Sequence, residues 1–95
     1  MLGLVDTKYE IISTSKFKKQ FKKVIKQGKD ISKFIEVLNV LANGKELSKK
    51  YNDHNLINTN LKECHIEPDW LLIYKYSNEK LILFLIETGS HSDLF

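Results

Sequence analysis

The hydrophobic residues of this chain change their spacing once, and that change limits the folds it can adopt. Over residues 15–42 apolar side chains recur at about every third or fourth position, the period of an amphipathic helix. Over residues 61–88 they form short runs rich in β-branched and aromatic residues, which is typical of strands. With 95 residues in all, the two patterns predict one α+β domain, spanning residues 1–95, whose helices cover a sheet.

A glycine divides the helical region into two helices. Ser15 is available as the N-cap of the first helix, and Gly28 is a suitable stop. Asp30 is placed to cap the second helix, which continues until Asn43-Gly44. The apolar stripes of the two helices are Phe17, Phe21, Val24 and Ile25, then Ile31, Phe34, Ile35, Leu38, Leu41 and Ala42. We therefore expect a helical hairpin whose apolar side packs on the strands.

Four strands are expected, at residues 9–13, 61–67, 70–76 and 81–88. The last three are joined by connections short enough to be hairpins. The fold predicted is a two-helix hairpin on a small, mainly antiparallel four-stranded sheet. Residues 1–7 are expected to be a tail or an N-terminal extension, and residues 45–60 a loop. The run from Leu81 to Ile86 is apolar on both faces, which places it inside the sheet, covered by helices on one side and by loops or a partner on the other.

Charge and cysteine content restrict the possible environments. Cys64 is the single cysteine, so no internal disulfide can form, and no apolar run is long enough to cross a bilayer. A cytoplasmic protein without a membrane partner is expected. The net charge is +3, and all 15 basic residues are lysine. The polar face of the first helix is either a solvated surface or one that follows phosphates. Its lysines are Lys16, Lys18, Lys19, Lys22, Lys23, Lys26 and Lys29.

Strand order alone brings three ionisable residues to one end of the predicted sheet. Two consecutive hairpins place the end of the 61–67 strand beside the start of the 70–76 strand and the end of the 81–88 strand. His65, Asp69 and His91 are then close together. Imidazole can transfer protons near neutral pH, a carboxylate can act as base or orient the imidazole, and lysine can neutralise phosphate. These groups suit RNA cleavage, in which a 2′-hydroxyl loses a proton and a 5′-oxygen gains one.

Each of these residues also has a purely structural explanation. His65 could be a cross-strand or core histidine, Asp69 a turn residue after proline, Trp70 a core residue and His91 a solvated residue of the tail. A metal site is not expected, because neighbouring residues on a strand such as Cys64 and His65 point to opposite faces. Cys64 is expected to face the core, which argues against a cysteine nucleophile.

Three motifs resemble those of the RelE superfamily of bacterial type II toxins, and more narrowly its YafQ-like branch. They are Asp53-His54, CHIEPDWLLIY at residues 64–74, and TGSHSDLF at residues 88–95. The order of strand, two helices, loop and three strands also agrees from about Tyr9 onward. The resemblance implies a metal-independent, cofactor-free mRNA endoribonuclease that cuts messages on the ribosome and leaves a 2′,3′-cyclic phosphate or its 3′-phosphate product. It also implies a cognate antitoxin as partner, with operator DNA bound only through the toxin–antitoxin complex.

Carried over to this sequence, the resemblance assigns roles to particular residues. The implied catalytic residues are His54, His65, Asp69 and His91, with His91 as general acid and Asp69 with His54 or His65 on the base side. The implied substrate contacts are Trp70, Phe95, Lys62 and Lys50. The implied contacts to phosphates and ribosomal RNA are Lys18, Lys19, Lys22 and Lys23. Lys62 stands close to where the family commonly carries an arginine. The alternative is a non-catalytic module of the same fold that binds an antitoxin and acts through DNA binding or another target.

Overall fold

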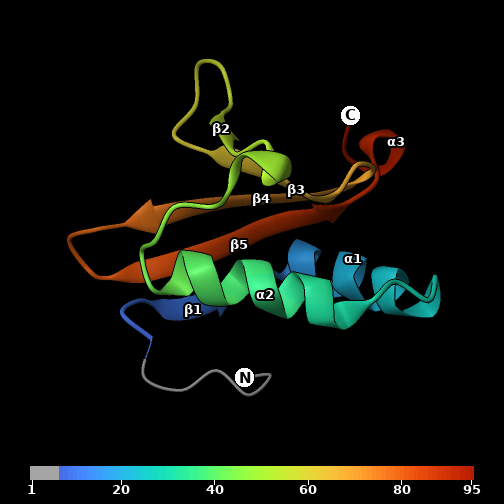
Figure 1. Cartoon of the computed structure of the whole chain (residues 1–95), viewed down its shortest axis with the longest axis horizontal. Coiled ribbons are helices and arrows are strands. Elements are labelled where there is room, and N and C mark those ends of the chain that lie inside the picture. The colour runs from blue at the N-terminus through green and yellow to red at the C-terminus, as the bar shows by residue number, and fades with distance from the viewer. Residues whose placement is uncertain (1–6) are drawn as a thin grey trace.

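Two helices, α1 (Ser15–Lys26) and α2 (Ile31–Ala42), lie on one face of a five-stranded sheet in the computed structural model, which describes residues 7–95 (Figure 1). Asp30 caps α2 as predicted, since its carboxylate accepts a hydrogen bond from the Ser32 amide. The cap of α1 is Thr14 instead of Ser15, because the Thr14 hydroxyl accepts from the Phe17 amide at 3.0 Å. Such a cap contributes about 1 kcal/mol to helix stability.

The sheet has the order β1-β5-β4-β3-β2, and only β1 runs parallel to its neighbour. Its strands are β1 (Glu10–Ser13), β2 (His54–Asn55), β3 (Lys62–Glu67), β4 (Trp70–Ser77) and β5 (Ile82–Gly89). The predicted α+β class, the mainly antiparallel sheet and both hairpins are confirmed. The predicted count of four strands is wrong.

The additional strand, β2, lies in the segment predicted to be a loop, as does a turn of 3-10 helix, η1 (Lys49–Tyr51). Its two residues are polar and pair with Glu63 and Lys62 of β3, so no hydrophobic alternation marks it in the sequence. Of the predicted tail, residues 1–6 lie outside the described residues.

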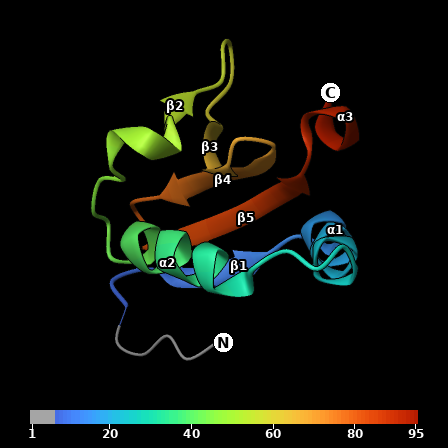
Figure 2. The same ribbon diagram turned by 45° about the vertical axis from the view of Figure 1, so that its right-hand side comes forward.

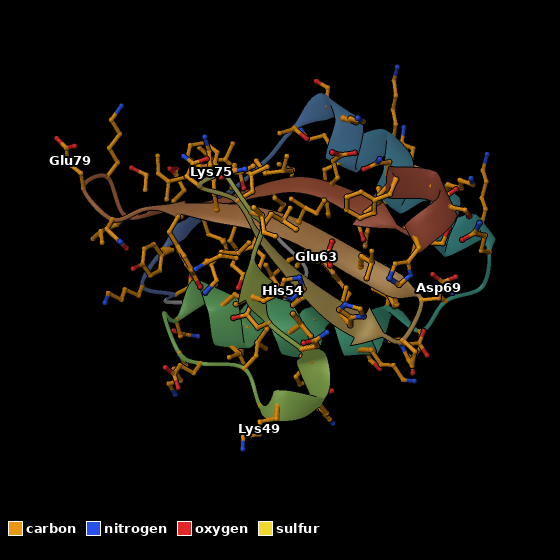
Figure 3. All side chains as sticks on the ribbon, turned by 90° about the horizontal axis from the view of Figure 1, so that it is seen from above. Lys49, His54, Glu63, Asp69, Lys75 and Glu79 are labelled. Carbon is orange, nitrogen blue, oxygen red and sulfur yellow. The ribbon has the colours of Figure 1, made fainter. Side chains whose placement is uncertain are left out.

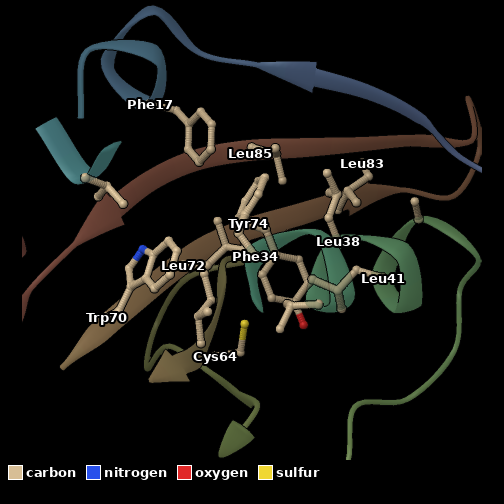
Figure 4. Close-up of a cluster of buried hydrophobic side chains, with 14 of the residues drawn as sticks. Phe17, Phe34, Leu38, Leu41, Cys64, Trp70, Leu72, Tyr74, Leu83 and Leu85 are labelled. Atoms are coloured by element: carbon tan, nitrogen blue, oxygen red, sulfur yellow. The ribbon is translucent and has the colours of Figure 1, made fainter. Parts of the chain in front are cut away.

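The main core lies between the two helices and the sheet (Figure 4). Phe17, Phe34 and Leu38 from the helices meet Leu72 and Tyr74 of β4, and all five are at most 1% exposed. The intervening β4 residues, Leu71 and Ile73, point to the opposite face of the sheet and are also buried, at 0% and 3% exposure. The face away from the helices is therefore covered as well, and it carries the candidate site. Over residues 7–95 no helix has the length and apolar character needed to cross a bilayer.

A one-turn helix, α3 (His91–Leu94), follows β5 and was not predicted. Ser90 and Asp93 form a capping box, in which the Ser90 hydroxyl accepts from the Asp93 amide and the Asp93 carboxylate accepts from the Ser90 amide. Lys23 of α1 donates to Asp93 at 2.9 Å, which ties α3 to the neighbouring helix (Figure 2).

Candidate active site

β2 and β3 bring His54, Glu63 and His65 to the face of the sheet that lies away from α1 and α2. His54 pairs with Glu63 across the two strands, and directly paired residues point to the same side (Figure 3). His65 follows Glu63 by two positions on β3 and shares its face. The rings of His54 and His65 are 6.3 Å apart between centroids. The strand missed in the sequence is thus the element that delivers the first histidine.

The β4–β5 hairpin brings in the third histidine. Leu71 pairs with His65 on one side and with Gly89 on the other, so the start of α3 lies beside the end of β3. The His65 and His91 rings are 5.6 Å apart between centroids. The predicted convergence of His65, Asp69 and His91 is confirmed, and His54 extends it into a row of three imidazoles.

Asp69 binds His91 through two hydrogen bonds to one carboxylate oxygen. The His91 amide donates to Oδ1 at 2.9 Å, and Nδ1 of the ring lies 2.7 Å from the same atom. These bonds, first that of the amide and then that of the ring, hold the pKa of Asp69 below its ordinary value. Asp69 was expected on the base side with His54 or His65. In the structure its hydrogen-bond partner is His91, so its assignment to the base side stays a prediction that this geometry does not favour.

The Nδ1 atoms of all three imidazoles face oxygen acceptors. In His54, Nδ1 donates to the Asn52 carbonyl at 2.7 Å, and in His65 it lies 3.3 Å from the Pro68 carbonyl. A carbonyl oxygen only accepts, so the proton of a neutral ring sits on Nδ1 and Nε2 carries the lone pair. The same holds for His91 beside the Asp69 carboxylate. Nε2 is therefore the nitrogen of each ring that can exchange a proton, and in His54 and His65 this atom lies near the Glu63 carboxylate.

Glu63 is a residue of this site that the sequence reasoning missed. Its Oε1 lies 3.4 Å from Nε2 of His54 and 3.7 Å from Nε2 of His65, so one carboxylate serves both rings. The residue is 6% exposed, and its Oε2 has no hydrogen-bond partner among residues 7–95. A buried carboxylate is stabilised by a positively charged neighbour. Either imidazole becomes such a neighbour when it takes up a proton. The spacing Glu63-x-His65 was the available signal for a shared face.

Two of the expected substrate contacts lie on the other face of the sheet. Trp70 is fully buried in the core with Leu72 and Tyr74, and its indole N–H donates to Thr88 at 3.0 Å (Figure 4). It has no free ring face on which a base could stack, so that prediction is wrong. Lys62 shares the core-side face of β3 with Cys64, and its ammonium lies 3.4 Å from Asp53. Lys62 therefore lies away from the histidines, and its contact with substrate stays a prediction.

The other two expected contacts remain accessible. Lys50 of η1 and His65 both line a groove of about 560 Å³ between η1, the end of β3 and α2. Tyr51 and Lys33 line it as well, and the ammonium of Lys50 lies 5.0 Å from the Tyr51 ring centroid. Phe95, directly after α3, is 73% exposed.

The four lysines expected to contact phosphates do not have equal roles. Lys23 is committed to Asp93 in the ion pair that holds α3. Lys18, Lys19 and Lys22 lie exposed on α1 and make no ion pair within residues 7–95. They leave a basic helix face close to the element that carries His91.

Neither a metal centre nor a cysteine nucleophile is indicated by the described residues. Across residues 7–95 no three histidine, cysteine, aspartate or glutamate side chains are arranged to hold a metal ion. Cys64 is fully buried, as predicted, and burial raises the pKa of its thiol, with the charges of Asp53 and Glu63 adding to the effect. The thiol therefore stays protonated.

Comparison with known proteins identifies relatives over most of the chain. Residues 9–95 match the family model described as "Bacterial toxin of type II toxin-antitoxin system, YafQ". The mRNA interferase toxin YafQ of Escherichia coli BL21-DE3 is 36% identical over 89 residues, covering 90% of this chain and 95% of that protein. The metal-bound toxin from Helicobacter pylori aligns with a TM-score of 0.86 at 38% identity, covering 92% and 99% of the two chains. YafQ in the E. coli DinJ–YafQ complex aligns with a TM-score of 0.84 at 33% identity, covering 92% and 98%.

Proposed function

Because this chain belongs to the YafQ family of toxins from type II toxin–antitoxin systems, we propose that it is a metal-independent endoribonuclease that cleaves ribosome-bound mRNA. The observation that carries the proposal is the row of three imidazoles, each with Nδ1 facing an oxygen acceptor, so that Nε2 is the nitrogen that can exchange a proton. In the reaction a ribose 2′-oxygen attacks the adjacent phosphorus and the bond from phosphorus to the 5′-oxygen breaks. A 2′,3′-cyclic phosphate and a free 5′-hydroxyl result.

His91 is the general acid in this proposal. The Asp69 carboxylate stays ionised near neutral pH, because its pKa is lowered, and it stabilises the protonated ring through Nδ1. The Nε2 proton then passes to the departing 5′-oxygen. The His91 side chain is 55% exposed, so a phosphodiester can reach it from solvent.

His65 is the base in this proposal. Its ring centroid lies 5.6 Å from that of His91, so one phosphodiester can contact His65 on one side and His91 on the other. Nε2 of His65 takes the proton of the 2′-hydroxyl. The negative Glu63 carboxylate then stabilises the resulting imidazolium, since its Oε1 faces the His65 ring as well as that of His54. Proton removal and proton return are thereby assigned to different histidines.

The groove beside His65 and the exposed lysines of α1 supply the RNA contacts. Lys50 binds a phosphate next to the scissile one, and Phe95 stacks on a neighbouring base. Lys18, Lys19 and Lys22 bind ribosomal RNA phosphates, which predicts that ribosome binding weakens steeply as salt rises. If ribosome binding did not change with salt concentration, those lysines would serve solubility alone.

The same proposal includes the protein's partners. A cognate antitoxin binds the free toxin in the cytoplasm, as the E. coli relative is found in a complex with DinJ. Operator DNA is contacted only through that complex. No metal or organic cofactor is needed, because the proton transfers are assigned to imidazoles and carboxylates.

Expression of the wild-type chain and of His91→Ala, without antitoxin, tests the proposal. The wild type should arrest growth and cut messages, and His91→Ala should do neither. Glu79→Gln, in the β4–β5 turn far from the site, is the matched surface control and should behave as wild type (Figure 3). Growth arrest by His91→Ala equal to wild type would favour a non-catalytic module acting through DNA or another target.

A further inference from the structure

Asp53 precedes the first histidine of the site, yet it has no part in the proton transfers described above. Its carboxylate lies on the core side of β3. Oδ1 accepts a hydrogen bond from the Tyr74 hydroxyl at 2.5 Å, and Oδ2 lies 3.4 Å from the ammonium of Lys62. Both oxygens are thus held by residues of β3, the neighbour of β2, and of β4, the next strand in the sheet.

Tyr74 is a rigid support for this contact. It is fully buried in β4, the central strand of the sheet, and packs against the core side chains of α2. Burial, followed by the hydrogen bond to Asp53, raises the pKa of its phenol, so the hydroxyl remains a donor at all physiological pH values. Asp53 is therefore bound to a buried residue of the central strand.

His54 itself is supported by little else. β2 has only two residues, and the His54 side chain is 42% exposed. Its Nδ1 donates to the carbonyl of Asn52, which has a left-handed backbone (φ 46°, ψ 48°) that asparagine tolerates. The orientation of the imidazole thus depends on the peptide groups of residues 52–54, and Asp53 is the member of that segment bound to the core.

We propose that Asp53 is a positioning residue: Tyr74 and Lys62 hold its carboxylate, and this fixes the Asn52 carbonyl and aims Nε2 of His54 at Glu63. The inference rests on the proposed ribonuclease function. Asp53 contacts no substrate, because its side chain points away from the face that carries the histidines. A buried hydroxyl in the core thereby controls an exposed ring on the other side of the sheet.

Cleavage of ribosome-bound mRNA by purified Tyr74→Phe toxin tests this proposal, with Tyr76→Phe as the matched control. The Tyr76→Phe substitution removes the same kind of group, a tyrosine hydroxyl. In the wild type this hydroxyl donates to the Leu41 carbonyl at 2.7 Å and not to Asp53. Misplacing an active-site group can cost up to about a hundredfold in rate, and His54 supports the base only through Glu63, so we expect kcat of Tyr74→Phe to fall about tenfold with KM unchanged. The ring 15N signals of His54 should shift in Tyr74→Phe and stay in place in Tyr76→Phe.

A purely stabilising role gives a different result. Wild-type kcat and wild-type His54 signals in Tyr74→Phe would overturn the proposal. If Tyr74→Phe does not fold, Asp53→Ala and Asp53→Asn replace it. Asparagine keeps an acceptor oxygen for the hydroxyl, so it should recover most of the rate lost in Asp53→Ala, and equal rates would overturn the proposal. Loss of activity in His91→Ala alongside unaffected Tyr74→Phe would refute the positioning role and leave the proposed function standing.

Discussion

The Asp69 carboxylate binds His91 twice, accepting from the backbone amide at 2.9 Å and from Nδ1 of the ring at 2.7 Å. One oxygen therefore fixes both the start of α3 and the orientation of the imidazole. The first bond joins the β3–β4 turn to the end of β5, and the second directs Nε2 to solvent. The position of the proposed acid is thus set by a residue 22 positions earlier in the sequence.

Asp69→Asn should separate positioning from charge. The amide oxygen can still accept from His91, but the negative charge that stabilises the protonated ring is lost. We expect kcat for mRNA cleavage to fall by about a hundredfold, the range of a general acid's contribution, while the melting temperature changes little. Single-turnover cleavage with a parallel thermal melt measures both. An unchanged kcat would remove Asp69 from the mechanism.

Glu63→Met should stabilise the protein and inactivate it. The Glu63 carboxylate is buried on the strand position that pairs with Ile73, and one of its oxygens is unpartnered among residues 7–95, which costs folding free energy. Replacing it with an apolar side chain of similar volume should raise the free energy of unfolding by about 1 kcal/mol or more.

Denaturant unfolding and cleavage assays of the same preparation check this prediction. Glu67→Gln is the control, because Glu67 is on the same strand but pairs with Lys33 on the surface. A Glu63→Met protein that is less stable than wild type, or equally active, contradicts the interpretation of Glu63 as a functional buried charge.

Gly89→Ala should displace α3. Gly89 has φ +154°, which L residues rarely adopt, and an added Cβ would lie 3.1 Å from Cβ of Asp93. The strain should cost about 1–3 kcal/mol of stability and lower kcat, because His91 follows two residues later. Gly28→Ala is the control: it is strained at φ +78° but has open space around it and is remote from α3. Equal kcat in the two variants would show that α3 tolerates the change.

An element of the fold could be predicted only where its residues form a recognisable pattern in the sequence. α1 and α2 were predicted because each carries a periodic apolar stripe, and the three long strands because they are short runs rich in β-branched and aromatic residues. α3 was missed, although Ser90-x-x-Asp93 is a capping box that a search for helix starts would have found. β2 was missed because its two polar residues carry no periodicity, and the burial of Glu63 becomes apparent only when β2 is placed.

Trp70 and Lys62 show that a sequence motif does not reveal which face of the sheet a residue occupies. Both were assigned to the substrate by motif position, whereas the face that a strand residue occupies is set by register. His65 pairs with Leu71, and this places Trp70 on the core side. A bulge between His65 and Glu67 obscures that register in the sequence.

The stability contributed by the α3 cap should depend on acid in a specific way. Lys23, followed by the Ser90 amide, lowers the pKa of Asp93 from 3.8 to about 2. Because the folded pKa is depressed, ionised Asp93 stabilises the fold above about pH 4, and this contribution is lost as the pH falls toward 2. In Lys23→Met the Asp93 pKa should rise toward 3.8, and in Lys19→Met it should not move. NMR titration of the Asp93 carboxyl carbon measures this, and identical titrations in both variants would contradict the assigned cause.

The most direct test of the account is cleavage of ribosome-bound mRNA in which the mapped scissile nucleotide carries a 2′-deoxyribose. If imidazoles of one face deprotonate a 2′-hydroxyl and protonate a 5′-oxygen, cutting at that bond should stop, and the all-ribose message should yield a 2′,3′-cyclic phosphate in the presence of a chelator. Cleavage of the deoxy message at the rate of the unmodified one would contradict the account.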